Sequence, residues 1–140
     1  MSGRLGRGGE GGQALIETAI TLPIMIVLFL GFLAIGLAVQ EAVDLNTAVY
    51  LATASAVTAP ANAPATGQAY AHDTYAYTLQ HFTYLEDSGH SIGCTGSWAP
   101  GTAVTCAATA TVRLSSTFAI VPDLPLTATA TATVPAYRSA

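Results

Sequence analysis

The sequence predicts an α+β protein: a long N-terminal transmembrane helix that continues as the spine of a small head with a second helix and an antiparallel β-sheet. One observation behind this prediction is the uninterrupted apolar run Leu22–Val39. As a helix it spans roughly 27 Å, close to the ~30 Å hydrocarbon thickness of a bilayer. The other is a C-terminal third in which threonine alternates with apolar residues, a period typical of strands that cover a core on one side.

One helix is expected from Gln13 to about Thr58, because apolar residues continue at helical spacing beyond the apolar run. Pro23 lies in its N-terminal part, where we expect it to bend the helix or remove one hydrogen bond. Past the apolar run, a face of small and aliphatic residues predicts packing on the head, with Glu41 and Asp44 on the solvent side. The residues of this face are Ala42, Leu45, Ala48, Val49 and Ala52.

Gly31, Ala34 and Ala38 form a strip of small residues within the apolar run. Such a strip lets a second helix approach closely. The alternative interpretation is composition alone, because alanine and glycine are common throughout the chain.

The head is expected to begin with a linker and a second helix. Thr58–Gly67 contains two prolines and a glycine, which is typical of a linker. A helix over Gln68–Leu85 is favoured because one apolar face persists along it, although Thr74–Leu79 alone also alternates like a strand. The apolar face consists of Ala71, Tyr75, Leu79, Phe82 and Leu85.

Two strands are predicted where apolar residues and threonine alternate, over Val104–Leu114 and Leu126–Val134. Thr117–Val121 is a candidate for a short third piece, and Pro122–Pro125 for the turn. The strands are too closely spaced for helical crossovers. We therefore expect an antiparallel sheet that packs on the helical spine.

Charge and cysteine placement indicate which side of the membrane the head occupies. Arg4 and Arg7 precede the apolar run, whereas the part after Val39 carries six acidic residues and two arginines, a net charge of −4. The positive-inside rule therefore predicts a cytoplasmic N-terminus and an extracytoplasmic head. In an oxidising exterior Cys94 and Cys106 are expected to form a disulfide; two unpaired thiols are the alternative.

The sequence contains no pattern typical of an enzyme, cofactor or metal site. His72, His81 and His90 are nine residues apart, which does not bring three imidazoles onto one helical turn, so exposed histidines are expected. A chain with 9% charged residues and no lysine also lacks the basic patch that a nucleic-acid partner requires. An aromatic cluster is either a subunit-contact face or part of the core. It consists of Tyr70, Tyr75, Tyr77, Phe82, Tyr84 and Trp98.

Glu17 lies just before the apolar run, where a carboxylate costs free energy if it enters lipid. One interpretation is a solvated carboxylate at the headgroup level with no further role. The other requires cleavage after Gly12, which would make Gln13 the new amino terminus. The Glu17 carboxylate would then pair with the terminal ammonium of a neighbouring helix, neutralise both charges and fix the axial register of the two subunits.

The segment Gly12–Glu17, GQALIE, followed by an apolar helix, resembles the prepilin-peptidase site of type IV pilin-like proteins. More closely, GQALIETAITLPIMIVLFLGF is similar to the start of the TadE-like proteins of tight-adherence pilus systems. Ala14, Glu17, Ala19 and Pro23 stand in register with that pattern. The resemblance implies that a prepilin peptidase cleaves after Gly12 on the cytoplasmic side and that Glu17 steers assembly.

The resemblance also implies a function: a structural minor pilin or pseudopilin, without a cofactor, that acts in pilus assembly and surface adhesion. The expected partners are membrane lipid, the prepilin peptidase and other pilin-like subunits, which the N-terminal helix contacts. The predicted organisation is a cytoplasmic leader (1–12), an anchor and helical spine (13–58) and an extracytoplasmic head (59–140). Two alternatives remain: a main filament subunit, and an uncleaved single-pass membrane protein whose head binds a ligand.

Overall fold

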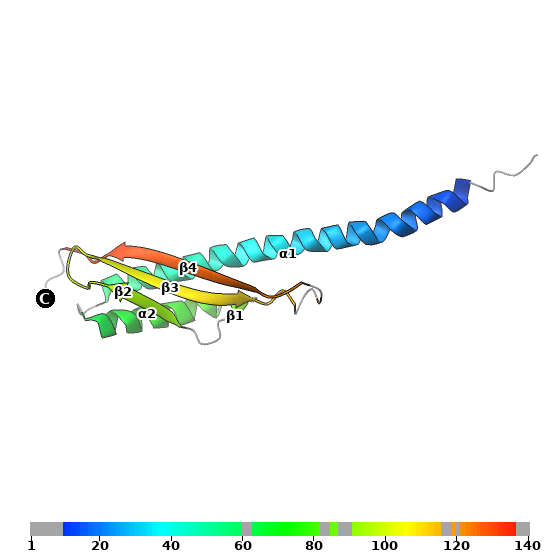
Figure 1. The fold of residues 1–140 in the computed structure, drawn as a ribbon. Coiled ribbons are helices and arrows are strands. Elements are labelled where there is room, and N and C mark those ends of the chain that lie inside the picture. Colours follow the sequence, from blue (N-terminus) through cyan, green and yellow to red (C-terminus); the bar gives the residue numbers. More distant parts are fainter. Residues whose placement is uncertain are drawn as a thin grey trace, which may run out of the picture. The chain divides into compact units, whose positions relative to one another are not determined.

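The computed structural model describes residues 10–59, 63–81, 85–86, 91–115, 119 and 121–136. It divides into two compact units, Met1–Ile35 and Gly36–Ala140. The described elements confirm the predicted α+β class (Figure 1). In chain order they are α1 (Glu10–Thr58), α2 (Pro64–Leu79), β1 (Leu85–Glu86), β2 (Ile92–Gly96), β3 (Ala103–Val112) and β4 (Leu124–Thr133).

In the first unit, the described residues all belong to the N-terminal part of α1. The helix continues through Pro23 without interruption. Most of its large apolar side chains are exposed, with exposed fractions between 41% at Leu33 and 76% at Phe32. By length and composition α1 can cross a membrane. An exposed apolar surface of this length indicates a single-pass membrane protein.

In the second unit, the C-terminal part of α1 and one face of α2 pack on one face of the sheet. From α1, Leu45, Ala48, Val49 and Ala52 are buried as predicted. Ala71, Tyr75 and Leu79 of α2, four residues apart, join the same core. The strands contribute alternate residues, among them Val104, Cys106, Ala108 and Ala128.

The predicted position of Glu41 was wrong. Its side chain is only 3% exposed, whereas Asp44 is half-buried. The reason is helical geometry: Glu41 lies four residues before Leu45 and seven before Ala48, so it shares the face that these residues bury.

Helix α2 is shorter at its end and longer at its start than predicted. It begins at Pro64, within the predicted linker, because proline at the first helical position loses no intrahelical hydrogen bond. It ends at Leu79, and Leu85 belongs to strand β1 instead. Phe82, expected on the same helical face, lies outside the described residues.

The sheet is antiparallel, with β3 in its centre. β4 pairs along one edge of β3 from Ala103↔Thr133 to Val112↔Leu124. On the other edge β2 pairs with residues 104–108 of β3, and β1 with residues 111–112. β3 and β4 confirm the two predicted strands, whereas β1 and β2 were not predicted.

The connections differ from the prediction at two places. β4 begins at Leu124 and contains Pro125, so the predicted turn Pro122–Pro125 is shorter than expected. Proline is tolerated there because β4 is an edge strand. The candidate third piece, Thr117–Val121, lies largely outside the described residues.

Gly96 ends β2 with a φ of +134°, a conformation that favours glycine. A Cβ at this position would lie 2.5 Å from the carbonyl oxygen of Ala103. The close approach of Gly96 to Ala103 therefore requires glycine at the end of β2. The register of β2 and β3 places Cys94 opposite Cys106.

Candidate functional site

The first turns of α1 place the predicted processing and assembly residues on consecutive turns of one helix. Gly12 and Gln13 lie near its start, where the backbone N–H groups have no intrahelical partner. Glu17 follows Gln13 by one turn. The Nε2 of Gln13 donates a hydrogen bond of 3.2 Å to Oε1 of Glu17, and both side chains are exposed.

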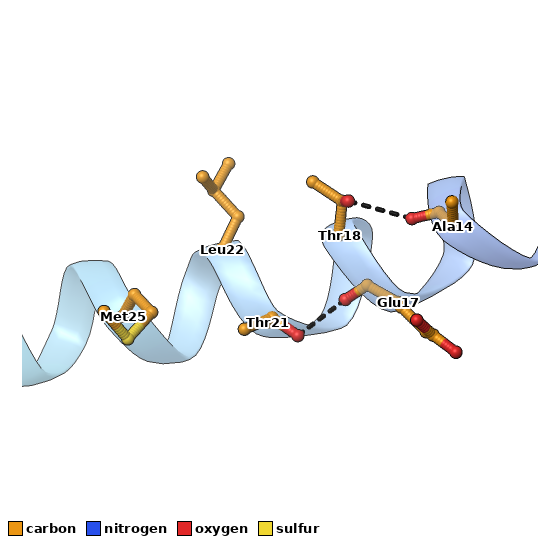
Figure 2. Close-up of a pocket in the computed structure, with 6 residues that line it drawn as sticks. All are labelled: Ala14, Glu17, Thr18, Thr21, Leu22 and Met25. Carbon is orange, nitrogen blue, oxygen red and sulfur yellow. Dashed lines mark hydrogen bonds between the residues drawn. The ribbon is translucent and has the colours of Figure 1, made fainter.

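Glu17 is one of six residues that line a shallow depression on the surface of α1 (Figure 2). Ala14, Glu17, Thr18, Thr21, Leu22 and Met25 line it. The Thr18 hydroxyl donates to the carbonyl oxygen of Ala14 at 2.8 Å, and the Thr21 hydroxyl to that of Glu17 at 2.7 Å. Both hydroxyl hydrogens are therefore used within the helix, which leaves a narrow, mostly apolar surface with one carboxylate.

Such a surface suits contact with another helix better than it suits catalysis. Small and internally bonded side chains allow close approach. A single carboxylate at a defined level favours a partner that presents a positive charge at the same level. Among the described residues, no group of histidine, cysteine or acidic side chains is arranged to hold a metal ion.

The strip of small residues is only partly accessible. Gly31 is half-buried, and a Cβ added to it would meet no atom within 4 Å. Ala34 is only 4% exposed, and Ala38 is half-buried. Gly31 and Ala38 are therefore more accessible to a second helix than Ala34 is.

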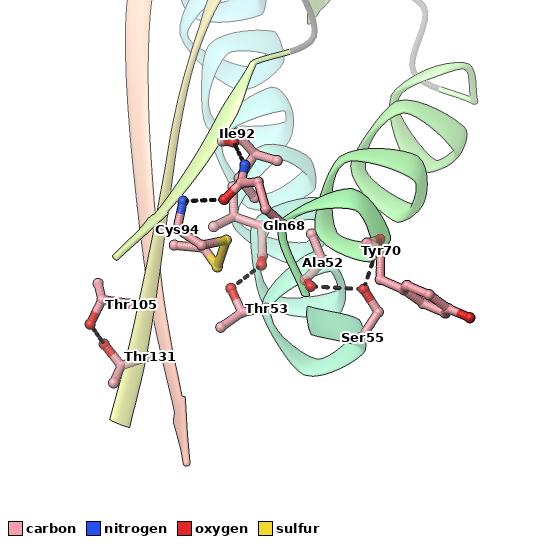
Figure 3. The surroundings of a disulfide bond; sticks show 11 residues. Ala52, Thr53, Ser55, Gln68, Tyr70, Ile92, Cys94, Thr105 and Thr131 are labelled. Carbon is pink, nitrogen blue, oxygen red and sulfur yellow. Dashed lines mark hydrogen bonds between the residues drawn. A yellow bond between two sulfur atoms is a disulfide. The ribbon is translucent and has the colours of Figure 1, made fainter. Parts of the chain in front are cut away.

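The disulfide between Cys94 and Cys106 is present and joins β2 to β3 (Figure 3). Gln68 of α2 holds the free edge of β2 at the same place. Its Nε2 donates to the Ile92 carbonyl oxygen, and its Oε1 accepts a 2.9 Å bond from the Cys94 N–H. The Ser55 hydroxyl links the helices by donating to the Tyr70 carbonyl oxygen at 3.1 Å.

The Gln68 contacts were missed by sequence analysis, because nothing in the local pattern pairs a helical glutamine with a strand that was itself not predicted. Gln68 bonds to the backbone as a neighbouring strand would. It therefore covers part of an edge that otherwise attracts strand addition.

Glu41 is a second carboxylate that sequence reasoning misplaced. Its Oε2 is buried and makes no hydrogen bond within the part of the chain that the structure describes. A carboxylate oxygen in this state costs free energy, because it has lost water without gaining a donor.

Among the described residues, the histidines and aromatic side chains that the sequence analysis singled out lie partly on the surface and partly in the core. His72 and His81 are exposed, with His72 Nδ1 3.7 Å from Oδ1 of Asp73, and His90 lies outside the described residues. Tyr75 is fully buried and Trp98 packs on the core, whereas Tyr70 and Tyr77 are exposed. The described aromatic residues thus divide between core and surface; Tyr84 is not among them.

Comparison with known proteins identifies one family. The model for TadE-like proteins matches residues 12–53, under half of the chain, and the match runs from Gly12 through Glu17 and Pro23 into the buried part of α1. No curated protein and no solved structure matches the chain. The match confirms the resemblance to the TadE-like proteins over residues 12–53.

Proposed function

We propose that this chain is a structural minor pilin, or pseudopilin, of a tight-adherence pilus. It is cleaved after Gly12 by a prepilin peptidase, retained in the cytoplasmic membrane and incorporated into the pilus through its N-terminal helix. The extracytoplasmic head, residues 59–140, faces outward and contributes to surface adhesion. The work of such a protein is association rather than a reaction.

One observation carries the proposal. The family match begins at Gly12 and covers the part of α1 whose large apolar side chains have little contact within their own chain. A helix with this surface needs lipid or other helices around it. Both environments belong to a pilin-like subunit, lipid before assembly and neighbouring helices after it.

In this proposal Glu17 drives docking. Its carboxylate is exposed on a surface that otherwise suits lipid, so an ammonium at the same level lowers its free energy. Cleavage after Gly12 provides that ammonium at Gln13 of a neighbouring subunit. The pair also sets the axial register, because a shift of one turn separates the two charges.

The test is to determine the N-terminus and mass of the protein extracted from membranes. We expect a chain that begins at Gln13, and a Gly12→Ala variant that keeps its leader and is heavier by 12 residues. Gly31→Ala is the matched control, because this glycine lies outside the processing site and the added methyl group meets open space. A native chain that still carries Met1 would contradict processing.

A second experiment tests assembly. Glu17→Ala is expected to enter the membrane normally and to reduce the recovery of pili, because the docking charge is gone. Normal piliation in this variant would remove the assembly role of Glu17. Pure fibres built from this chain alone would instead favour a main filament subunit, and an unprocessed mature mass would favour a single-pass membrane protein with a ligand-binding head.

A further inference from the structure

The hydrogen bond between Gln13 and Glu17 has a chemical consequence once Gln13 becomes an amino terminus. An N-terminal glutamine can cyclise to pyroglutamate, which would remove the ammonium that docking requires. The side-chain amide that reacts in this cyclisation is the same amide that donates to Glu17 Oε1 at 3.2 Å.

We propose that Glu17 protects the mature amino terminus from cyclisation by holding the Gln13 side-chain amide along the helix. This inference rests on the proposed cleavage after Gly12. It assigns Glu17 a second role within its own chain, as a positioning residue that preserves the ammonium of Gln13 until a neighbouring carboxylate pairs with it.

The reaction that Glu17 opposes is balanced without a cofactor or oxidant. The α-nitrogen of Gln13, after losing a proton, attacks the Cδ carbon of its own side chain and forms a five-membered lactam. The bond from Cδ to Nε2 breaks, and Nε2 leaves as ammonia, which takes up the released proton. The terminus changes from a positively charged ammonium to a neutral lactam.

Geometry explains the protection. Cyclisation requires the side chain to fold back so that Cδ reaches the α-nitrogen of the same residue. The observed bond requires the opposite, because Glu17 lies one turn further along α1 and holds Nε2 in that direction. The two conformations exclude each other, so each increase in the bonded population lowers the reactive one.

The expected size of the effect follows from the strength of the bond. On an exposed helix, a hydrogen bond between a neutral and a charged side chain four residues apart is weak. At that strength, the Gln13–Glu17 bond slows cyclisation about twofold. A bond to a charged acceptor in a less polar surrounding, such as a membrane interface, slows it about tenfold.

The experiment uses residues 13–140 in detergent micelles, with Gln13 exposed as the first residue by site-specific removal of an added leader. The chain is incubated at neutral pH, and the N-terminal peptide is followed by mass spectrometry for the loss of one ammonia molecule. Glu17→Ala is expected to cyclise about two- to tenfold faster than the unchanged chain. Glu17→Gln keeps a neutral oxygen acceptor and is expected to react at an intermediate rate.

Two controls separate the proposed role from a general effect on the helix. Thr18→Ala removes a neighbouring side chain that bonds to Ala14 and not to Gln13, so its rate should match the unchanged chain. Gln13→Asn cannot form the five-membered lactam and should show no loss of ammonia by this route.

Equal rates in the unchanged chain and Glu17→Ala would overturn the inference, as would a pilus-extracted chain that is already fully cyclised. Equal rates would leave the question of cleavage open, whereas a cyclised Gln13 would itself show that the chain had been cleaved after Gly12. Conversely, a native chain that retains Met1 would contradict the proposed processing, while the rates measured on residues 13–140 would still decide whether Glu17 restrains Gln13.

Discussion

The two parts of α1 differ in which side chains they expose and which they bury, although they form one continuous helix. In the first unit the helix carries large apolar side chains that stay exposed, such as Phe32 at 76%. In the second unit its buried face is built from smaller side chains, such as Ala48 and Ala52, at 0%. Small residues let α1 lie close to the sheet and α2, whereas the large ones gain from an environment that the chain itself does not provide.

The same contrast separates the two carboxylates of the helix. Glu17 is exposed and receives a hydrogen bond from Gln13, whereas Glu41 is buried and its Oε2 has no hydrogen-bond partner among the described residues. Whether each carboxylate is buried or exposed therefore depends more on the helical face it occupies than on its distance from the apolar run. Variants that affect one unit and not the other test this separation directly.

Removal of the disulfide is expected to have the largest effect, and only on the head. Replacing Cys94 and Cys106 by serine should lower the free energy of unfolding of the head by about 3 kcal/mol, because the unfolded chain is no longer cross-linked. Trp98, the single tryptophan, reports the denaturant midpoint by fluorescence in detergent. Membrane extraction of the variant should be unchanged.

The control is the unchanged protein treated with reductant, which should show the same lowered midpoint. An unaltered midpoint in both samples would mean that the helices and the sheet hold the head without the cross-link.

Two Gly→Ala variants, one in each unit, compare the effect of adding the same methyl group. Gly67 packs against the ring of Trp98, so a Cβ at this position would collide with that ring. Gly67→Ala should therefore destabilise the head by about 1–3 kcal/mol. Gly31→Ala adds the same methyl group in open space and should leave the unfolding of the head within about 0.5 kcal/mol.

Equal effects of the two glycine variants on Trp98 fluorescence unfolding would contradict the expectation that the added methyl group destabilises the head only at Gly67. A loss of pilus recovery in Gly31→Ala, with an unchanged head, would instead indicate that the small-residue strip contacts a neighbouring helix.

Helical spacing predicted more of this molecule than did local polarity. The 3.6-residue period identified α1 and the buried face Ala71, Tyr75 and Leu79, because these patterns need only one element to be recognised. Glu41 was misplaced because its charge was weighed above its position four residues before Leu45.

Contacts between elements were harder to predict. β2 is short and rich in glycine, and its two-residue alternation is weak, so the strand was missed together with the Gln68 bonds to it. At the candidate site, the pattern predicts roles for Gly12, Glu17 and Pro23, and these roles stay predictions. The hydrogen bond from Gln13 to Glu17 was not predicted, because residue spacing does not determine a side-chain rotamer.

Replacement of the buried carboxylate is expected to raise stability. Glu41→Met removes the unbonded Oε2 and keeps a long side chain, so the free energy of unfolding of the head should increase by about 1 kcal/mol. Glu17→Met, its counterpart in the first unit, should not change the unfolding of the head. A lower midpoint for Glu41→Met would show that the Glu41 carboxylate has a stabilising partner in the folded head.

The smallest effect concerns Asp123, just before β4, and it depends on pH. Hydrogen bonds from the side chain and backbone N–H of Ser115, the latter 3.0 Å long, and the nearby positive charge of Arg113 hold the pKa of this carboxyl below its ordinary value. A lowered pKa in the folded state means that the carboxylate stabilises the head fully above the unfolded pKa of about 3.9. This contribution disappears as the pH falls through the lower, folded value.

Asp123→Asn should therefore lower the denaturant midpoint at neutral pH, but only slightly, because the carboxylate is exposed and its interactions are screened. In strong acid the substitution should have no effect, because the carboxyl group of the unchanged protein is then protonated. The measurement is the Trp98 midpoint of both proteins from neutral pH to below the unfolded pKa. A difference that grows as the pH falls would contradict the sign of the shift. A difference independent of pH would assign the effect to the Ser115 hydrogen bond without its charge.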